Sequence, residues 1–403
     1  MKRIVFVVGN YKNGGVPMHS TNLANEFARK GYAATILATK EIADNIFFAL
    51  HENVELVSLR QFIEDNSSNP VLLAEAEKQN KEIRRIKKLR YLTRFIPKWD
   101  KKLDKRIRAI RKCGTLRQYM ILNQGTIVIP FGAAYYEQAF HATRDLDCKV
   151  IYAERNAPEL EVSPDPEIAA DFFQMLGKAD GAVFQTKDEE AYYRPYIKKN
   201  TAVIHNPIKK DLPAPYVGER RKVIVNYCRI SQQKNLRLLI DSFVDLHKEF
   251  PDYSLEIYGN TVAESEELLR EELKQYIAEQ GLGDCVCILP PTADVHSRVR
   301  DCAMFVSSSD FEGLSNSMIE AMAIGMPCVC TDCLGGGARE MIEDGINGIL
   351  VPLQDRTALC QGMKRMIEDR NLAERCGRNA AEVINEMSVD IIADKWLKVI
   401  ENA

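Results

Sequence analysis

Two glutamates in the last third of the chain, Glu312 and Glu320, are separated by seven residues. The first follows an apolar segment at residues 304–307, and the second lies in a helical segment that Ser315 or Asn316 can cap. A carboxylate accepts hydrogen bonds at both of its oxygens, which suits a pair of neighbouring hydroxyl groups. The pair therefore indicates two contacts along one elongated, hydroxyl-rich ligand, although glutamates at some such spacing are common.

Two cations, Arg229 and Lys234, flank the loop between an expected strand at residues 222–227 and the helix after Asn235. Positive side chains beside a helix N-terminus are suited to hold a diphosphate and to neutralise a leaving group without a metal ion. For either residue taken alone, an ordinary surface position is the competing interpretation.

Short apolar runs predict the elements that position these side chains. Residues 4–8 are apolar throughout, as in strands that are buried on both faces of a parallel sheet. Similar runs alternate with helical patterns along the chain, which predicts an α/β protein with doubly wound, Rossmann-like parallel sheets. The expected strands are residues 4–8, 33–38, 54–59, 126–130, 149–153, 181–186, 201–204, 222–227, 254–258, 286–289, 304–307, 327–330 and 348–351.

A proline-rich linker at residues 206–218 divides this series into two halves. We expect an N-terminal domain at residues 1–210 and a C-terminal domain at residues 217–385, which face each other across a cleft. The final segment, residues 386–403, is expected to form a helix with Trp396 that crosses back to the N-terminal domain.

Two stretches of the N-terminal half have more than one interpretation. Gly14 and Gly15 follow the first strand, and such a turn lets the backbone approach a phosphate at a helix N-terminus, but a plain glycine turn is an equal alternative. Glu154, Arg155 and Asn156 directly follow the strand at 149–153, where ligands of α/β sheets bind. Salt bridging within that loop is the alternative.

A helical insertion at about residues 70–118 is strongly basic. Residues 78–117 contain 17 Lys and Arg and three acidic residues, whereas the whole chain has a net charge of −3. Apolar residues such as Ile83 and Ile86 form one stripe, with a break at Pro97. A charged surface hairpin and docking on an anionic membrane surface both fit this pattern. A nucleic-acid partner is not expected, because no reading motif accompanies the charge.

Eleven cysteines without a regular framework favour free thiols in a reducing cytoplasm. Cys328 and Cys330 have a spacing seen in metal ligands, but they lie in an apolar strand pattern, so structural thiols are favoured and no metal site is predicted. No apolar run of about 18 residues occurs, which argues against a membrane span. We expect a cytoplasmic protein, peripheral on the inner face of the cell membrane.

The segment from Glu312 onward closely resembles one enzyme family. It reads Glu312-Gly313-Leu314-Ser315-Asn316-Ser317-Met318-Ile319-Glu320-Ala321-Met322-Ala323-x-Gly325-x-Pro327, which is similar to the E-x7-E region of the family 4 retaining glycosyltransferases of GT-B fold. Further similarities, in the expected order over both halves, are Gly14-Gly15, Arg229-x4-Lys234-Asn235, Ile257-Tyr258-Gly259, Gly335-Gly336-Gly337-Ala338-Arg339-Glu340 and Asp344-Gly345-x-Asn347-Gly348-x-Leu350-Val351-Pro352. Together these motifs are specific.

The resemblance implies a role for each matched position. Arg229 and Lys234 would bind the diphosphate of a nucleotide-sugar donor, Glu320 its ribose, and Glu312 the hydroxyls of the donor sugar. Gly15 would let the first-half loop approach the β-phosphate. The remaining implied donor contacts are the backbone amides of Gly313, Leu314, Ser315 and Asn316 near the phosphates, and the backbone at Leu289 near the base.

One departure from the family concerns the facing domain. Many members place a histidine at the end of a first-half strand, and neither Pro130-Phe131 nor Ala153-Glu154-Arg155-Asn156 contains one. The Glu-Arg-Asn-x-Pro form resembles a subgroup that builds bacterial surface polysaccharides, which implies a place for Arg155 in the site. The catalytic candidates are therefore Glu312, Arg229, Lys234 and Arg155.

We expect a hexosyltransferase that moves a hexose or N-acetylhexosamine, with retention, from a UDP-sugar to a hydroxyl of a glycan acceptor. The acceptor is expected to be lipid-linked, in the synthesis of bacterial surface polysaccharide or glycoconjugate, and no cofactor or metal is expected. Two alternatives remain: a UDP-sugar epimerase of the same fold, and a non-catalytic, membrane-docked nucleotide-sugar-binding subunit.

Overall fold

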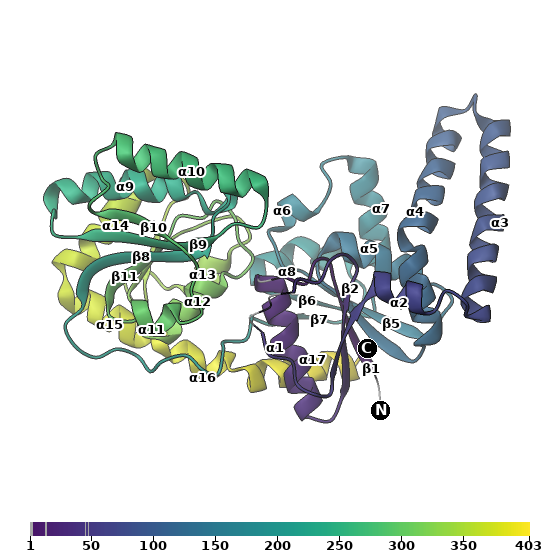
Figure 1. Cartoon of the computed structure of the whole chain (residues 1–403), viewed down its shortest axis with the longest axis horizontal. Coiled ribbons are helices and arrows are strands. Elements are labelled where there is room, and N and C mark those ends of the chain that lie inside the picture. Colours follow the sequence, from purple (N-terminus) through teal and green to yellow (C-terminus); the bar gives the residue numbers. More distant parts are fainter. Residues whose placement is uncertain (1–2, 13, 45, 47) are drawn as a thin grey trace.

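The computed structural model describes residues 3–12, 14–44, 46 and 48–403. The chain forms two α/β domains that lie side by side, and both chain ends lie in the N-terminal domain (Figure 1). One domain contains a sheet of seven parallel strands and the other a sheet of six. The predicted pair of doubly wound parallel sheets is confirmed.

The N-terminal sheet has the strand order β3-β2-β1-β4-β5-β6-β7. Its strands are β1 (Arg3–Val8), β2 (Ala33–Ala38), β3 (Val54–Ser58), β4 (Thr126–Pro130), β5 (Cys148–Ala153), β6 (Gly181–Phe184) and β7 (Thr201–Val203). The helices of this half are α1 (Gly15–Arg29), α2 (Leu59–Asp65), α3 (Pro70–Thr93), α4 (Pro97–Leu122), α5 (Ala133–Ala142), α6 (Pro158–Glu161), α7 (Pro166–Leu176) and α8 (Lys187–Tyr193), followed by a 3-10 turn at Arg194–Tyr196.

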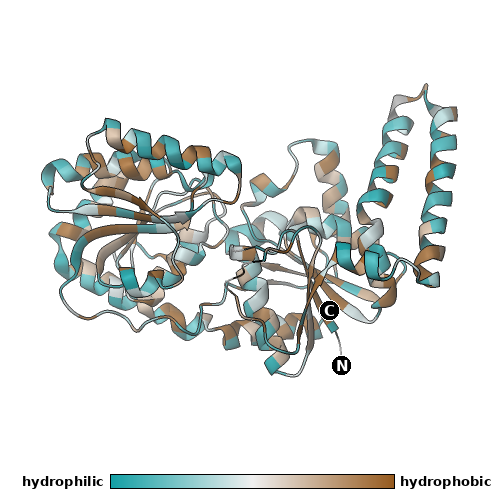
Figure 2. Ribbon diagram, in the orientation of Figure 1, coloured by the Kyte–Doolittle hydropathy of each residue, from teal (hydrophilic) through white to brown (hydrophobic). Residues whose placement is uncertain are grey.

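After Arg3, strand β1 is apolar because helices cover both faces of its sheet. Alternate side chains, such as Phe6, face a core shared with α1, whereas Val5 and Val7 face a second core shared with α4 and α5. Every residue of β1 after Arg3 is therefore buried. Figure 2 shows the same pattern, with apolar strands inside and more polar helix surfaces outside.

The C-terminal sheet has the strand order β10-β9-β8-β11-β12-β13. Its strands are β8 (Arg221–Arg229), β9 (Ser254–Asn260), β10 (Val286–Leu289), β11 (Cys302–Ser307), β12 (Cys328–Thr331) and β13 (Ile349–Val351). The helices of this half are α9 (Leu236–Glu249), α10 (Glu264–Glu279), α11 (Val295–Val299), α12 (Asn316–Ala323), α13 (Gly337–Met341), α14 (Arg356–Glu368), α15 (Arg370–Ala380), α16 (Ile384–Met387) and α17 (Val389–Glu401), with 3-10 turns at Gln232–Lys234 and Ala381–Val383.

One predicted strand is longer than expected in a way that affects the candidate site. The strand predicted at residues 222–227 extends to Arg229, because β8 keeps its pairing with β9 up to Arg229 opposite Asn260. Arg229 is thus the last residue of a strand rather than a loop residue, and Lys234 ends the 3-10 turn that follows.

Helices α3 and α4 form an antiparallel hairpin that projects from the N-terminal domain (Figure 1). The second half of α4 anchors it, because Leu116, Tyr119 and Met120 are buried in the N-terminal core. None of the described helices combines the length and the apolar composition needed to span a lipid bilayer.

The last helix, α17, belongs to the N-terminal core although it follows the C-terminal domain in sequence. Ile392, Trp396 and Ile400 lie in the same hydrophobic cluster as Phe6 and Phe27. Lys30, directly after α1, also pairs with Asp390 at 2.8 Å and with Asp394 at 2.9 Å.

Replacing the fully buried Trp396 by alanine is expected to destabilise the N-terminal domain by about 3–5 kcal/mol, the usual cost of removing a large core side chain. The loss is measured as faster amide hydrogen exchange in β1 and β4. Lys398→Ala, on the exposed side of the same helix, is the matched control and should leave that exchange unchanged. Equal protection of β1 in both variants would contradict the packing described for α17.

Candidate active site

A nearly buried ion pair joins Lys234 to Glu312. The ammonium of Lys234 donates to Glu312 Oε1, and Ser309 Oγ donates to the same oxygen at 3.0 Å. Only 14% of the Lys234 side chain and 13% of the Glu312 side chain are exposed. Burial lowers the pKa of Lys234, but the charge of Glu312 and its hydrogen bond outweigh burial and raise that pKa above its ordinary value. Lys234 is therefore a permanent cation at neutral pH.

Arg229, at the end of β8, makes no contact with Glu312 among the hydrogen bonds and ion pairs of the described residues. Its Nε is 3.3 Å from Glu266 Oε1, and Nη2 donates to Gln233 Oε1 at 3.3 Å. The side chain is 47% exposed, so it is free to reorient toward an anion at little desolvation cost.

Glu320 lies on α12, which Ser315 caps by accepting from the Met318 N–H. Glu320 is buried, and its Oε2 is 2.9 Å from Nε2 of the buried His296 on α11. The His296 ring contacts the Tyr227 ring edge-on at 5.5 Å between centroids. This pair could not be predicted from the sequence, because His296 lies on another element, 24 residues before Glu320, and has no motif of its own.

Leu289, the predicted contact to a base, is the last residue of the edge strand β10, opposite Tyr258 of β9. It is half-buried, and the next helix, α11, carries His296. The Leu289 and Glu320 ends of the candidate site are therefore connected through α11. Among the described residues, no group of three or more His, Cys, Asp or Glu is arranged to hold a metal ion.

Glycines let the backbone of residues 312–314 pack against a second loop. A Cβ at Gly335 would lie 2.0 Å from Glu312 O, and one at Gly337 would lie 1.8 Å from Gly313 O. Because real Cβ atoms do not approach so closely, side chains at these two positions would displace the backbone of Glu312 and Gly313. The glycine run found in the sequence therefore allows the close backbone packing that positions residues 312–314.

The N-terminal domain contacts the start of α12 directly. The Leu314 N–H donates to Gln185 Oε1 at 3.3 Å, and Asn206 Nδ2 donates to Leu314 O at 3.1 Å and to Asn316 Oδ1 at 2.8 Å. A Cβ at Gly15 would lie 3.2 Å from Asn316 Nδ2. The structure thus brings Gly15 next to Asn316, two residues that the sequence placed in facing domains.

Arg155 does not contact Lys234, Glu312 or Glu320 among the described hydrogen bonds and ion pairs. Its guanidinium lies over the Phe131 ring at 4.6 Å and over the Trp396 ring at 5.4 Å, and Nη1 donates to Glu154 O at 2.8 Å. Its backbone lies against the site instead, because a Cβ at Gly313 would lie 3.2 Å from the Arg155 carbonyl carbon.

The neighbouring Glu154 is fully buried and organises this loop. Its Oε2 accepts from the hydroxyls of Tyr152 at 2.5 Å and Tyr193 at 2.6 Å, and its Oε1 accepts from the N–H groups of Arg155 and Asn156. Burial raises the pKa of Glu154 to about 7, and the hydrogen bonds from the two tyrosines act in the opposite direction. The loop is therefore held by hydrogen bonds to its own carboxyl group.

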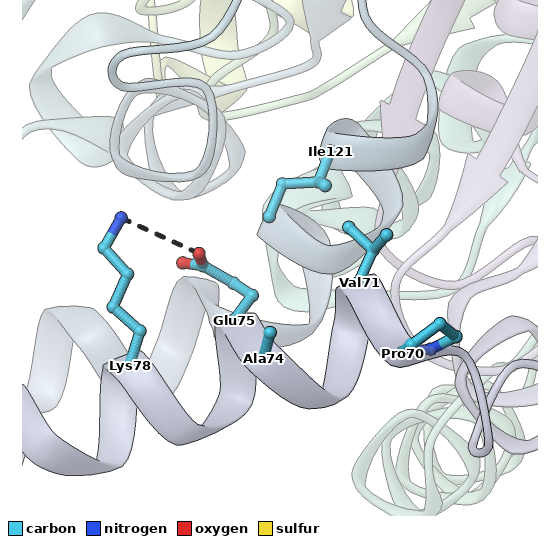
Figure 3. Close-up of a pocket in the computed structure, with 6 residues that line it drawn as sticks. All are labelled: Pro70, Val71, Ala74, Glu75, Lys78 and Ile121. Atoms are coloured by element: carbon cyan, nitrogen blue, oxygen red, sulfur yellow. Dashed lines mark ion pairs between the residues drawn. The ribbon is translucent and has the colours of Figure 1, made fainter.

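A hollow elsewhere on the N-terminal domain contains none of the predicted site residues. It lies at the base of the α3–α4 hairpin and is lined by Pro70, Val71, Ala74, Glu75, Lys78 and Ile121 (Figure 3). The candidate site is therefore defined by side chains and glycine contacts at the domain interface, not by this hollow.

Comparison with known proteins identifies relatives of this arrangement. Residues 209–383 match the family model described as "Glycosyl transferases group 1". One relative is the N-acetylgalactosamine-N,N'-diacetylbacillosaminyl-diphospho-undecaprenol 4-alpha-N-acetylgalactosaminyltransferase of Campylobacter jejuni. The two sequences are 34% identical over 156 residues, and this aligned segment covers 39% of the present chain and 40% of the relative. The chain spans less than two thirds of the length of the first curated relatives that it matches, and reaches 61% of one from Haemophilus influenzae.

Two solved structures are similar over almost the whole chain. The G117R mutant of S. aureus TarM, in complex with fondaparinux, alpha-GlcNAc-glycerol and UDP, superposes with a TM-score of 0.74 at 14% identity, and the match covers 99% of both chains. Anabaena HepE, in complex with UDP and glucose, superposes with a TM-score of 0.71 at 17% identity and covers 100% of both chains. At these identities the likeness establishes the fold, and the predicted GT-B architecture is confirmed.

Glu154 makes folding stability depend on pH. Its folded pKa of about 7 exceeds the unfolded value of about 4.3, so its favourable contribution is complete below the unfolded pKa and is lost as pH rises through 7. We expect Glu154→Gln, which keeps an acceptor for the two backbone N–H groups, to remove this dependence.

The measurement is the free energy of unfolding of both proteins at about pH 5 and about pH 8. The difference, variant minus wild type, should rise by roughly 3 kcal/mol between these values. Glu159→Gln, at an exposed neighbouring position, is the control and should show no such trend. Parallel pH profiles for wild type and Glu154→Gln would show that Glu154 titrates normally.

Proposed function

We propose that this chain, a group 1 glycosyltransferase by the match of its residues 209–383, moves a hexose or N-acetylhexosamine from a UDP-sugar to a glycan hydroxyl with retention. The partial match to the Campylobacter jejuni N-acetylgalactosaminyltransferase supports the class of sugar and acceptor. UDP in the complexes of TarM and HepE supports the nucleotide.

The observation that carries the proposal is the pairing of Lys234 with Glu312 beside the carboxyl ends of β8 and β11. Ligands of open α/β sheets bind at this edge. A donor diphosphate would draw Lys234 partly away from Glu312, and Arg229 would turn from Glu266 toward the same phosphates. Glu312 would then be available to accept hydrogen bonds from the sugar hydroxyls, with the amides of residues 313–316 beside the phosphates.

The transfer proceeds on one face of the sugar. The bond between the anomeric carbon and the β-phosphate oxygen breaks, a bond from the acceptor oxygen to the same carbon forms, and the acceptor proton passes to the β-phosphate. Lys234 and Arg229 stabilise the charge that develops on the diphosphate, so neither a protein base nor a metal ion is required. Gly15 lets the backbone at the start of α1 approach the β-phosphate.

Glu320 binds the ribose, the backbone at Leu289 meets the base, and His296 is a positioning residue that fixes the carboxylate of Glu320. Arg155 is the catalytic candidate of the facing domain. Its fixed guanidinium, stacked on Phe131 and Trp396, supports a role in holding the site loop and the acceptor side.

The proposed acceptor is a lipid-linked glycan of a bacterial surface polysaccharide or glycoconjugate, reached at the cytoplasmic membrane surface. The basic region of residues 78–117 supports this partner, because anionic lipids attract clustered lysine and arginine side chains.

Lys234→Ala and Arg229→Ala are each expected to lower kcat/KM for the UDP-sugar by about 10²–10³, as for the loss of one preorganised electrostatic donor. Lys222→Ala, in an exposed ion pair with Asp252, is the control and should retain normal turnover. The assay follows UDP release with and without acceptor, and thermal unfolding checks that each variant is folded. Near-normal turnover of folded Lys234→Ala would refute the assignment, and an isomerised UDP-sugar formed without acceptor would identify an epimerase.

His296→Asn is expected to raise KM for the UDP-sugar about tenfold with kcat changed less than twofold. The reason is that Glu320 loses one hydrogen bond to its charged group and with it a fixed orientation. His247→Asn, on α9, serves as the control, because its ring contacts the Tyr253 carbonyl at 3.2 Å and no side chain of the candidate site among the described hydrogen bonds. If kcat fell and KM did not change, His296 would act on the chemical step rather than on Glu320.

Chelation by EDTA is expected to leave the rate of transfer unchanged, because Lys234 and Arg229 supply the positive charge at the diphosphate. The rate is measured before and after dialysis against the chelator, and again after adding back Mg²⁺ or Mn²⁺. Loss of activity that a divalent ion restores would show that the leaving group is metal-assisted.

A further inference from the structure

The distal end of the α3–α4 hairpin carries a cluster of exposed apolar side chains, which we call the hairpin tip. It consists of Tyr91, Leu92, Phe95, Ile96 and Trp99, with exposed fractions between 50% and 80%. Residues 94–96 form the turn between the two helices. Contiguous exposed apolar side chains are uncommon on soluble domains and mark interaction sites.

The apolar stripe found in the sequence is buried mainly between the two helices of the hairpin. Ile86, Leu103 and Ile107 are buried between the two helices, and Ile83 and Ile110 pack against them. For most of its length the stripe therefore lies between the two helices and does not face outward. Among the described residues of the hairpin, the large exposed apolar side chains lie at the tip, which Leu89 adjoins, and at the anchored base, where Val71, Leu73 and Leu122 are exposed.

The charge around the tip is one-sided. The acidic residues of 78–117 are all engaged within the hairpin: Glu82 pairs with Arg106, Asp100 with Arg90, and Asp104 with Arg90 and Arg108. Five cations near the tip are exposed and form no ion pair among the described residues: Lys87, Lys88, Arg94, Lys101 and Lys102. The tip is thus an apolar end surrounded by uncompensated positive charge.

We propose that the hairpin tip inserts into the interfacial region of an anionic lipid bilayer, with Tyr91, Phe95 and Trp99 at headgroup depth. Tyrosine and tryptophan favour this depth because their rings are apolar at one end and polar at the other. The Arg94 guanidinium, 4.6 Å from the Tyr91 ring centre and 4.8 Å from that of Phe95, lies between apolar rings and lipid phosphates. Because this inference specifies the membrane contact used in the proposed function, it rests on that proposal.

Charge selects this occupant over a second copy of the chain. If two hairpin tips came together, the exposed lysine and arginine side chains around each tip would face those of the other. Like charges at an interface oppose association. An anionic bilayer can bury the apolar rings in its interface and pair the cations with its headgroups at the same time.

The length of the hairpin also determines the distance between the two domains and the membrane surface. Helix α3 has 24 residues and is therefore about 36 Å long, and the tip lies at the end far from the domain body (Figure 1). The hollow of Figure 3 lies at the opposite, anchored end of the hairpin, so it does not take part in the contact. Insertion of the tip leaves both domains in water.

The chain contains two tryptophans, which makes the contact directly measurable. Trp396 is fully buried and Trp99 is 54% exposed, so a change of emission on vesicle binding reports on Trp99. With vesicles of equal parts phosphatidylcholine and phosphatidylglycerol, we expect a blue shift and quenching by acyl-chain-brominated lipid, both absent in Trp99→Phe. Co-sedimentation without any change of Trp99 emission would mean purely electrostatic docking and would overturn insertion.

Variants separate the apolar contact from the charge. Phe95→Ser/Trp99→Ser is expected to weaken vesicle binding at least tenfold, whereas Val262→Ser/Leu268→Ser, which removes two exposed apolar side chains of the C-terminal half, should change it less than twofold. Lys87→Gln/Lys88→Gln should reduce the preference for phosphatidylglycerol over phosphatidylcholine alone. A concentration-dependent dimer that Phe95→Ser/Trp99→Ser abolishes would identify a second copy as the occupant and overturn the proposal.

These experiments use the full chain without sugar nucleotide, so they do not depend on catalysis. Transfer to a water-soluble acceptor by Phe95→Ser/Trp99→Ser should equal that of the wild type. Normal transfer with no vesicle insertion by the wild type would refute the inference alone. Insertion without any transfer would refute the proposed function alone.

Discussion

The close approach of backbone segments at the domain interface is the constraint on which the candidate site depends. Residues 312–314 lie against Gly335 and Gly337 on one side and against Gln185 on the other, and a Cβ at Gly313 would lie 2.2 Å from Gln185 Oε1. This packing fixes where Glu312 leaves the backbone. It also explains why the glycines matter, without phosphate binding: the lack of a side chain at Gly313 permits a contact between domains, and at Gly335 and Gly337 it permits backbone contacts with residues 312–314.

Charged side chains from both domains and the linker meet at this interface. Lys210 of the linker pairs with Glu26 of α1 at 3.2 Å, and the adjacent Lys209 is 3.8 Å from Glu320. On the other side, Thr186 Oγ1 donates to Gly335 O at 2.9 Å, and Arg339 pairs with Asp188 at 3.1 Å. A change in the relative position of the domains would therefore disturb both ends of the site, because the same residues connect the domains and neighbour the carboxylates.

The α3–α4 hairpin shows why the apolar pattern of a helix does not reveal which partner its apolar face contacts. The sequence identified two basic helices separated near Pro97, and the structure has them at Pro70–Thr93 and Pro97–Leu122. The same apolar stripe was compatible with a membrane-facing side and with helix pairing, because both bury one face of a helix. Only the antiparallel pairing decided that Ile86 and Ile107 face each other and that Phe95 remains outside.

The sequence by itself determined the two parallel sheets and showed a resemblance to one glycosyltransferase family, because apolar runs of strand length and local motifs report on burial and backbone geometry near each residue. It also predicted that Glu312 and Lys234 belong to one site. Only the tertiary structure decided that these two form a nearly buried ion pair, that His296 holds Glu320, and that Arg155 stacks on Trp396 of the last helix. Those contacts join residues from separate elements, and side-chain direction across an interface leaves no periodic trace in a sequence.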